Sequence, residues 1–153
     1  MSGILAQGAA MFEGCFTHVV DGKGRVNMPQ PFRDGGCDRF KLTVGAEGCL
    51  YAYDMGGWAR ILEAIGSLPT SDEHARNAQR LIIGLSATVE ADTHGRVLIP
   101  QMHREMSGIQ RNVVFIGAAN RIEVWAQERW EAQFGSPGAD YRKVYEELQR
   151  YGC

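Results

Sequence analysis

The sequence repeats one phrase, Asp-x-x-Gly-Arg-Val-x-x-Pro, at residues 21–29 and again at residues 92–100. When the second phrase is placed on the first, identities extend on both sides, and after one inserted residue 45–58 align with 117–130. The identical pairs include Thr17 and Thr88, Gln30 and Gln101, Arg33 and Arg104, and Trp58 and Trp130. Each copy has about 50 residues, too few to bury much of its own surface. We therefore predict two diverged copies of one unit that share a core.

Each copy has the local signals of a β-rich unit. Strand-forming runs flank the turn residues of each phrase, which predicts a β-hairpin with a loop of about four residues. Asp accepts backbone N–H groups at the start of the turn, Gly supplies positive φ, and Pro ends the second strand. A short helical turn is predicted to follow, and then a second hairpin over residues 39–53 and 112–125. The pattern predicts an α+β fold with antiparallel strands.

Three apolar stripes with helical spacing accompany these strands. The first predicts a helix that begins at Trp58, with Ile61, Leu62 and Ile65 on the same face. Thr70 to Glu73 has the form of a capping box, which predicts a connecting helix over residues 69–82. The last stripe consists of Tyr141, Val144, Tyr145, Leu148 and Tyr151. We expect this last stripe to pack on its own chain, and a partner surface is the alternative.

Composition restricts the class of protein. A charged fraction of 22% and a hydrophobic fraction of 44% are typical of a globular protein, and no apolar run reaches the length of a membrane helix. The net charge of −2 and the pI near 6.1 mean that nucleic-acid binding would require a local basic patch. The four cysteines have no CxxC spacing, so we expect reduced thiols in the cytoplasm and no metal site.

Arginine is the one residue of the phrase that turn chemistry does not require. In one interpretation it pairs with the Asp of its loop at the surface, which contributes about 0 to 1 kcal/mol. In the other, a two-fold arrangement of the copies presents both arginines on one face, each able to bind a phosphate or the O6 and N7 atoms of guanine. The neighbouring charges favour a basic patch. In the first copy, Lys23, Arg25 and Arg33 are positively charged and Asp21 is negatively charged. In the second copy, Arg96 and Arg104 are positively charged and Asp92 is negatively charged.

The two phrases, their spacing, "AQRLIIGLSA" before the second and "NVVFIGAANRIEVWAQERW" after it resemble the MraZ family of bacterial transcriptional regulators. This family lies within the AbrB-like swapped-hairpin superfamily. The resemblance covers roughly residues 11–134. It implies two tandem AbrB-like half-barrels (swapped-hairpin, double-split β-α-β) with pseudo-two-fold symmetry, packing helices, and assembly into a closed homo-oligomeric ring. It also implies control of the division and cell-wall gene cluster, the protein's own operon included.

The resemblance divides the chain into five segments. They are a flexible N-terminal extension (1–10), the first repeat (11–68), a connecting helix (69–82), the second repeat (83–134) and a C-terminal helix (135–153). By position, the DNA-binding residues are Arg25 and Arg96. Charge and exposure add Lys23 and His94. The residues that shape the loops are Asp21, Gly24, Asp92 and Gly95.

Double-stranded DNA is thus the expected partner of a cytoplasmic, nucleoid-associated protein that needs no cofactor and shows no evident small-molecule substrate. An oligomeric protein-interaction module without direct DNA binding is the alternative. We do not expect an enzyme, because the sequence contains no HExxH, P-loop or GxSxG motif. The four histidines are expected in turns or at the surface, and Cys15 and Cys49 as buried small hydrophobic residues.

Overall fold

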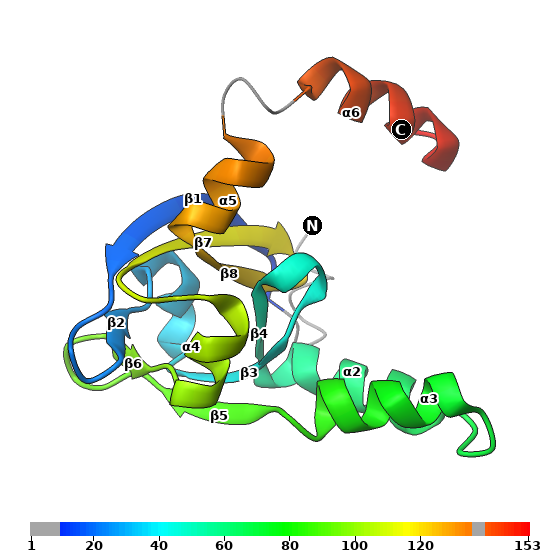
Figure 1. Cartoon of the computed structure of the whole chain (residues 1–153), viewed down its shortest axis with the longest axis horizontal. Coiled ribbons are helices and arrows are strands. Elements are labelled where there is room, and N and C mark those ends of the chain that lie inside the picture. The colour runs from blue at the N-terminus through cyan, green and yellow to red at the C-terminus, as the bar shows by residue number, and fades with distance from the viewer. Residues whose placement is uncertain (1–9, 136–139) are drawn as a thin grey trace.

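The computed structural model describes residues 10–135 and 140–153 (Figure 1). The predicted N-terminal extension therefore lies outside the described residues, apart from Ala10. One six-stranded antiparallel sheet has the order β1 (Phe12–Val19), β7 (Asn112–Ala119), β8 (Ile122–Ala126), β4 (Leu50–Asp54), β3 (Arg39–Val44) and β5 (Ala87–Glu90). A separate short ladder joins β2 (Arg25–Asn27) to β6 (Arg96–Leu98). The α+β prediction with antiparallel strands is confirmed.

The order of the strands is symmetric with respect to the two repeats. Strands β1, β2, β3 and β4 correspond in the sequence alignment to β5, β6, β7 and β8. The first strand of each repeat pairs with the third strand of the other, because β1 lies beside β7 and β5 lies beside β3. The repeats meet at β4 and β8 in the middle of the sheet. Each repeat thus completes the sheet of the other.

The predicted hairpin within each phrase is wrong in its pairing. The turns form, and Asp21 N donates to Arg25 O at 2.8 Å and Asp92 N to Arg96 O at 2.8 Å. The flanking strands then separate, since β1 pairs with β7 and β2 pairs with β6. Turn residues specify a change of chain direction but not the partner of the strand that follows. The second hairpin of each repeat is confirmed, with β3 beside β4 and β7 beside β8.

Helices follow the strands in both repeats. After β2 comes the 3-10 segment η1 (Gln30–Gly36), and after β6 comes α4 (Gln101–Ser107), as predicted. Helix α2 (Met55–Gly66) follows β4, and α5 (Gln127–Phe134) follows β8. The Oδ1 of Asp54 accepts from Gly57 N at 2.9 Å, so α2 begins ahead of Trp58. Trp58 is buried, whereas Leu62 of the predicted apolar face is exposed.

The connecting helix exists but begins at a different cap. Helix α3 (Glu73–Ala78) continues into a π-helical turn, η3 (Gln79–Ile83), and Asp72 Oδ1 accepts from His74 N at 2.8 Å. The predicted capping box at Thr70 is therefore wrong. A turn in which Asp72 N donates to Pro69 O at 3.1 Å removes Thr70 from the cap position. Helices α2 and α3 extend together away from the sheet (Figure 1).

One hydrophobic core contains side chains from both repeats. Its buried members include Phe40, Leu50 and Val26 of the first repeat and Phe115, Ile122 and Val97 of the second. The predicted shared core is confirmed. A smaller aromatic cluster lies under α5, where Trp125 contacts Trp130 and Phe134 edge to face at 5.6 and 5.7 Å. The tryptophan that ends the second hairpin therefore anchors the helix after it.

The prediction that the C-terminal stripe packs on its own chain is wrong. Helix α6 (Tyr141–Glu147) and the 3-10 turn η4 (Leu148–Tyr151) lie apart from the sheet (Figure 1). Tyr141, Val144, Tyr145 and Tyr151 are all exposed. The stripe has helical spacing but no core opposite it within the described chain. None of the helices that the structure describes has the length and hydrophobicity needed to span a membrane.

Candidate nucleic-acid interface

The two repeated loops have the same hydrogen-bond geometry. In the first loop, Asp21 Oδ1 accepts from Lys23 N at 2.8 Å and from Arg25 N at 2.9 Å. In the second, Asp92 Oδ1 accepts from His94 N at 2.8 Å and from Arg96 N at 3.0 Å. One carboxylate oxygen of each Asp thus closes its loop, and the other oxygen faces the arginine side chain.

Glycine is required in each loop by backbone geometry. The φ angles of Gly24 and Gly95 are 88° and 82°, which place both residues in the left-handed region that residues with a Cβ rarely adopt. Both glycines are buried although the three residues before each of them are exposed. The predicted function of Asp and Gly as turn residues agrees with this geometry.

Hydrogen bonds from the backbone lower the pKa of both aspartates. The N–H groups of Arg25 and Lys23 lower the pKa of Asp21, and the positive charges of Arg25 and Arg96 lower it further. The N–H groups of Arg96 and His94, together with the Arg96 side chain, lower the pKa of Asp92.

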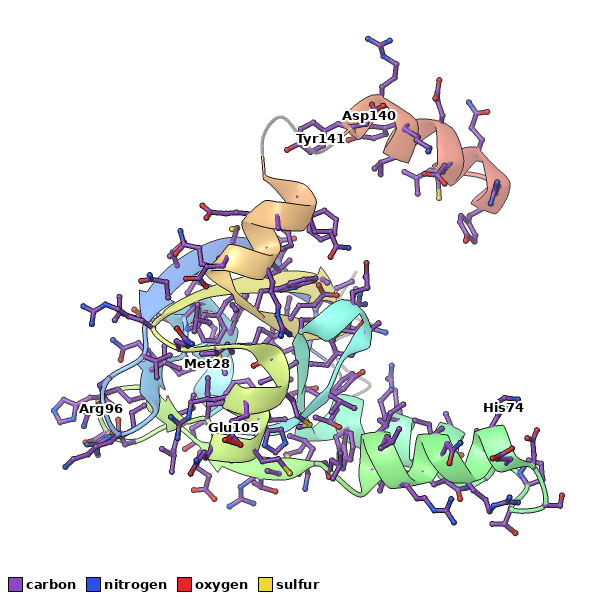
Figure 2. All side chains as sticks on the ribbon, in the orientation of Figure 1. Met28, His74, Arg96, Glu105, Asp140 and Tyr141 are labelled. Carbon is purple, nitrogen blue, oxygen red and sulfur yellow. The ribbon has the colours of Figure 1, made fainter. Side chains whose placement is uncertain are left out.

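Arg25 and Arg96 extend from these loops with their terminal nitrogens available. Arg25 Nε lies 3.5 Å from Asp21 Oδ2, and Arg96 Nε donates to Asp92 Oδ2 at 3.0 Å. Within residues 10–135 and 140–153, the Nη atoms of both arginines have no hydrogen-bond partner. Figure 2 shows Arg96 at the edge of the molecule formed by the two loops. A hydrogen bond through Nε therefore orients Arg96, and the ion pair with Asp21 orients Arg25. Both guanidinium groups can bind a ligand through Nη.

The β2–β6 ladder connects the two loops directly. Arg25 is paired with Leu98 and Arg96 with Asn27, on either side of the buried pair Val26 and Val97. Backbone bonds extend the ladder, because Met28 N donates to Gly95 O at 2.9 Å and Ile99 N donates to Gly24 O at 3.0 Å. The structure thus brings both predicted arginines to one edge of the molecule.

The two flanking residues, Lys23 and His94, are exposed at the tips of their loops. Lys23 Nζ has no hydrogen-bond partner among the described residues, and His94 Nδ1 lies 3.5 Å from Thr93 Oγ1. Both side chains are therefore accessible beside the arginines.

Two further arginines belong to this edge and were not predicted as site residues. Arg33 Nε donates to Met28 O at 3.0 Å, and Arg104 Nε donates to Ile99 O at 3.0 Å. From the sequence alone, these two arginines are only positive charges of the predicted basic patch. Arg33 aligns with Arg104 when the two repeats are superimposed in sequence, and this match is the signal that could have identified them.

Other chemistry-bearing residues give no competing site. His103 is buried on α4, where its Nε2 lies 2.7 Å from Leu85 O, so its predicted surface position is wrong. The residue type alone does not predict that His103 lies on the core-facing side of α4. Cys49 is buried as predicted, but Cys15 is exposed, because it lies on the face of β1 that also exposes Glu13, Thr17 and Val19. Within the described residues no cluster of His, Cys, Asp or Glu can hold a metal ion.

An apolar pocket of about 360 Å³ lies between α2, η3 and β4, far from the loops. It is lined mainly by aliphatic and tyrosine side chains, including Tyr51, Tyr53, Ile61, Ile65 and Ile82. Burial raises the pKa of Tyr53. No carboxylate, imidazole or thiol side chain is among the residues that line this pocket.

Known proteins are similar to this chain over most of its length. A family model described as "MraZ protein, putative antitoxin-like" matches residues 11–81 and again residues 82–149. A protein named transcriptional regulator MraZ from Acetivibrio thermocellus is 38% identical over 142 residues, which cover 93% of this chain and 99% of the relative. The protein of the same name from Lachnoclostridium phytofermentans is 40% identical over 122 residues, 80% of this chain and 86% of the relative. That from Caldicellulosiruptor saccharolyticus is 35% identical over 93% of this chain and 99% of its own length.

Proposed function

The chain belongs to the MraZ family, and from this premise we propose that it is a transcriptional regulator that binds double-stranded DNA through its two Arg-bearing loops. The relatives described above carry the name transcriptional regulator, which supports this class of function. We propose the division and cell-wall gene cluster, including the protein's own operon, as its target. Such a protein acts in the cytoplasm, in association with the nucleoid.

One observation carries the proposal: the paired presentation of Arg25 and Arg96. Each is oriented by the Asp of its own loop, and both lie beside one short ladder. The Nη groups match the geometry of a phosphate or of guanine O6 and N7. Lys23 and His94 add donors at the loop tips. A chain of net charge −2 can thus present a local basic edge to DNA.

We further propose that the fold consists of two AbrB-like swapped-hairpin half-barrels. The exchange of β1 and β5 between the repeats supports this classification. The proposed units are residues 11–68 and 83–134, with 69–82 as the connection and 135–153 as the C-terminal helix. Asp21, Gly24, Asp92 and Gly95 then shape the DNA-binding loops.

The proposed active form is a closed ring of identical chains. The exposed aromatic stripe of α6 and η4 supports a contact between subunits, because an apolar surface of this kind usually has a partner. Several loop pairs on one ring would bind repeated sites together, with a gain in avidity of about 100 to 10,000 where the geometry permits. Removal of residues 135–153 should lower the mass of the assembly in light scattering if this stripe joins the subunits.

The decisive experiment compares DNA binding by the parent and by the Arg25→Ala/Arg96→Ala double mutant, on a duplex from upstream of the gene. The parent should bind with an affinity that falls steeply as salt rises from about 50 to 200 mM, and the mutant should not bind. A control, Arg39→Ala/Arg76→Ala, removes the same charge outside the loops and should bind like the parent. The proposal is wrong if the folded loop mutant binds as tightly as the parent.

The second candidate is an oligomeric protein-interaction module without direct DNA binding. The exposed stripe of α6 favours it as much as it favours a ring. Absence of any DNA shift by the parent at low salt, together with an intact oligomer, would support the module over the regulator.

A further inference from the structure

Arg33 and Arg104 each lie over the loop glycine of the other repeat. A Cβ placed on Gly95 would be 2.7 Å from Arg33 Cζ, and one placed on Gly24 would be 2.9 Å from Arg104 Cζ. Real Cβ atoms do not approach other atoms so closely, so the missing side chain of each glycine creates the space for the guanidinium. This contact explains why both glycines are buried in otherwise exposed loops.

Each of these arginines is also anchored at its other end. Arg33 Nε donates to Met28 O, and Met28 N donates to Gly95 O. Arg33, Met28 and Gly95 are therefore linked by two hydrogen bonds and by the contact of the Arg33 guanidinium with Gly95. Arg104, Ile99 and Gly24 are linked in the same way at the first loop.

From this geometry we infer that Arg33 and Arg104 are positioning residues that act across the repeats, Arg33 on the loop of Arg96 and Arg104 on the loop of Arg25. The inference rests on the proposed function for its effect on DNA, but the coupling itself is a property of the free protein. Each repeat supplies one DNA-binding arginine and the support for the arginine of the other repeat. The relative placement of Arg25 and Arg96 is then set by side chains as well as by the β2–β6 ladder.

The first test uses hydrogen exchange in the free protein, without DNA. Lysine keeps the charge but lacks the planar fork and the Nε–H bond of arginine. Arg33→Lys should increase amide exchange in residues 92–96 and leave residues 21–25 unchanged, and Arg104→Lys should do the reverse. Increased exchange only in the loop of the mutated repeat would overturn the inference.

A matched control exists on α5. Arg129 Cζ would lie 2.9 Å from a Cβ on Gly108, which also has positive φ, and Arg129 Nη1 donates to Gly48 O at 2.9 Å. Arg129→Lys should disturb neither loop. If it increases amide exchange in residues 92–96 as much as Arg33→Lys does, the effect is general destabilisation and the inference fails.

The second test is a pair of double-mutant cycles read as DNA affinity. Arg33→Lys should weaken binding by about fivefold in the parent and in Arg25→Ala, but by less than about twofold in Arg96→Ala. Arg104→Lys should show the opposite dependence. Equal losses in both alanine backgrounds would mean that Arg33 contacts DNA directly, which overturns the positioning role.

A further variant keeps the inference testable if a lysine substitution prevents folding. Gly95→Ala should displace Arg33 and shift its Nε–H resonance, while the Nε–H resonance of Arg104 stays in place. An unchanged Arg33 resonance in folded Gly95→Ala would contradict the contact.

If the parent binds no DNA but the exchange pattern holds, the proposed function fails and the cross-repeat coupling stands. If the parent binds DNA and the exchange pattern is absent, the coupling fails and the proposed function stands.

Discussion

Arg96 donates its Nε–H to Asp92 Oδ2 at 3.0 Å, and this bond has no full counterpart in the other loop. Arg25 Nε lies 3.5 Å from Asp21 Oδ2 and is buried without a hydrogen bond. The two loops therefore share a backbone geometry and differ in how firmly the arginine is held.

This difference predicts unequal protection of the two side chains. The Nε–H of Arg96 should exchange with solvent more slowly than that of Arg25 in NMR spectra of the free protein. Asp92→Asn keeps an oxygen to close the loop but removes the charged acceptor, so it should abolish the protection of Arg96 Nε–H. Asp21→Asn serves as the control and should change Arg25 little. Equal protection of both groups in the parent would contradict the geometry.

The loop aspartates predict a loss of stability in acid. Donated N–H groups lower the pKa of Asp21 and Asp92 in the folded state. Their stabilising contribution is therefore complete above the pKa of the unfolded chain, and it is lost as the pH falls through the lower folded pKa. A carboxyl NMR titration should find that the pKa of each of these two carboxyl groups lies below its ordinary value. The double variant Asp21→Asn/Asp92→Asn should lose part of the acid dependence of unfolding, and an unchanged acid dependence would argue against these bonds.

Thiol reactivity should divide the cysteines by environment. Burial raises the pKa of Cys49 to about 12, and burial also raises the pKa of Cys37, which is half-buried. Cys15 and Cys153 are exposed. With a disulfide reagent at about pH 8, Cys15 and Cys153 should react first, and Cys49 should react only after unfolding. Rapid labelling of Cys49 in the native protein, located by peptide mapping, would show that the segment just before β4 opens.

The shared core predicts one unfolding transition. Phe40 and Phe115 come from different repeats and are 0% and 1% exposed. Phe40→Ala and Phe115→Ala should each lower the free energy of unfolding by about 3 to 5 kcal/mol in denaturant titrations. Val144→Ala on exposed α6 should change it by less than about 0.5 kcal/mol. Two separate transitions in either phenylalanine variant would mean that the repeats unfold independently.

Local chemistry made much of this fold readable from the sequence. The turns at Asp21 and Asp92 and the hairpins of β3 with β4 and β7 with β8 follow from residue type and spacing. The partners of β1 and β5 do not follow, because a strand next to a turn meets the same hydrogen-bonding needs with a near or a distant neighbour. The core that both repeats share, with Phe40 from one and Phe115 from the other, favours the exchange, and that core is a property of the complete chain.

The candidate site shows the same limit. Alignment of the repeats identifies Arg25 and Arg96 because turn chemistry does not explain them. The covering of Gly95 by Arg33 depends on the β2–β6 ladder between the repeats, so it cannot be derived from the spacing of either repeat alone. The exposure of Tyr145 on α6 likewise depends on what lies opposite the helix, and the stripe itself carries no such information.

The exchange of β1 and β5 has a consequence for how the loop pair depends on concentration. A single repeat would have to obtain its missing strand from a second molecule, so its loops would pair only when two chains meet. Here the segment that contains α3 joins the repeats, which makes the encounter intramolecular. The two arginine loops therefore form together in one chain, however dilute the protein is.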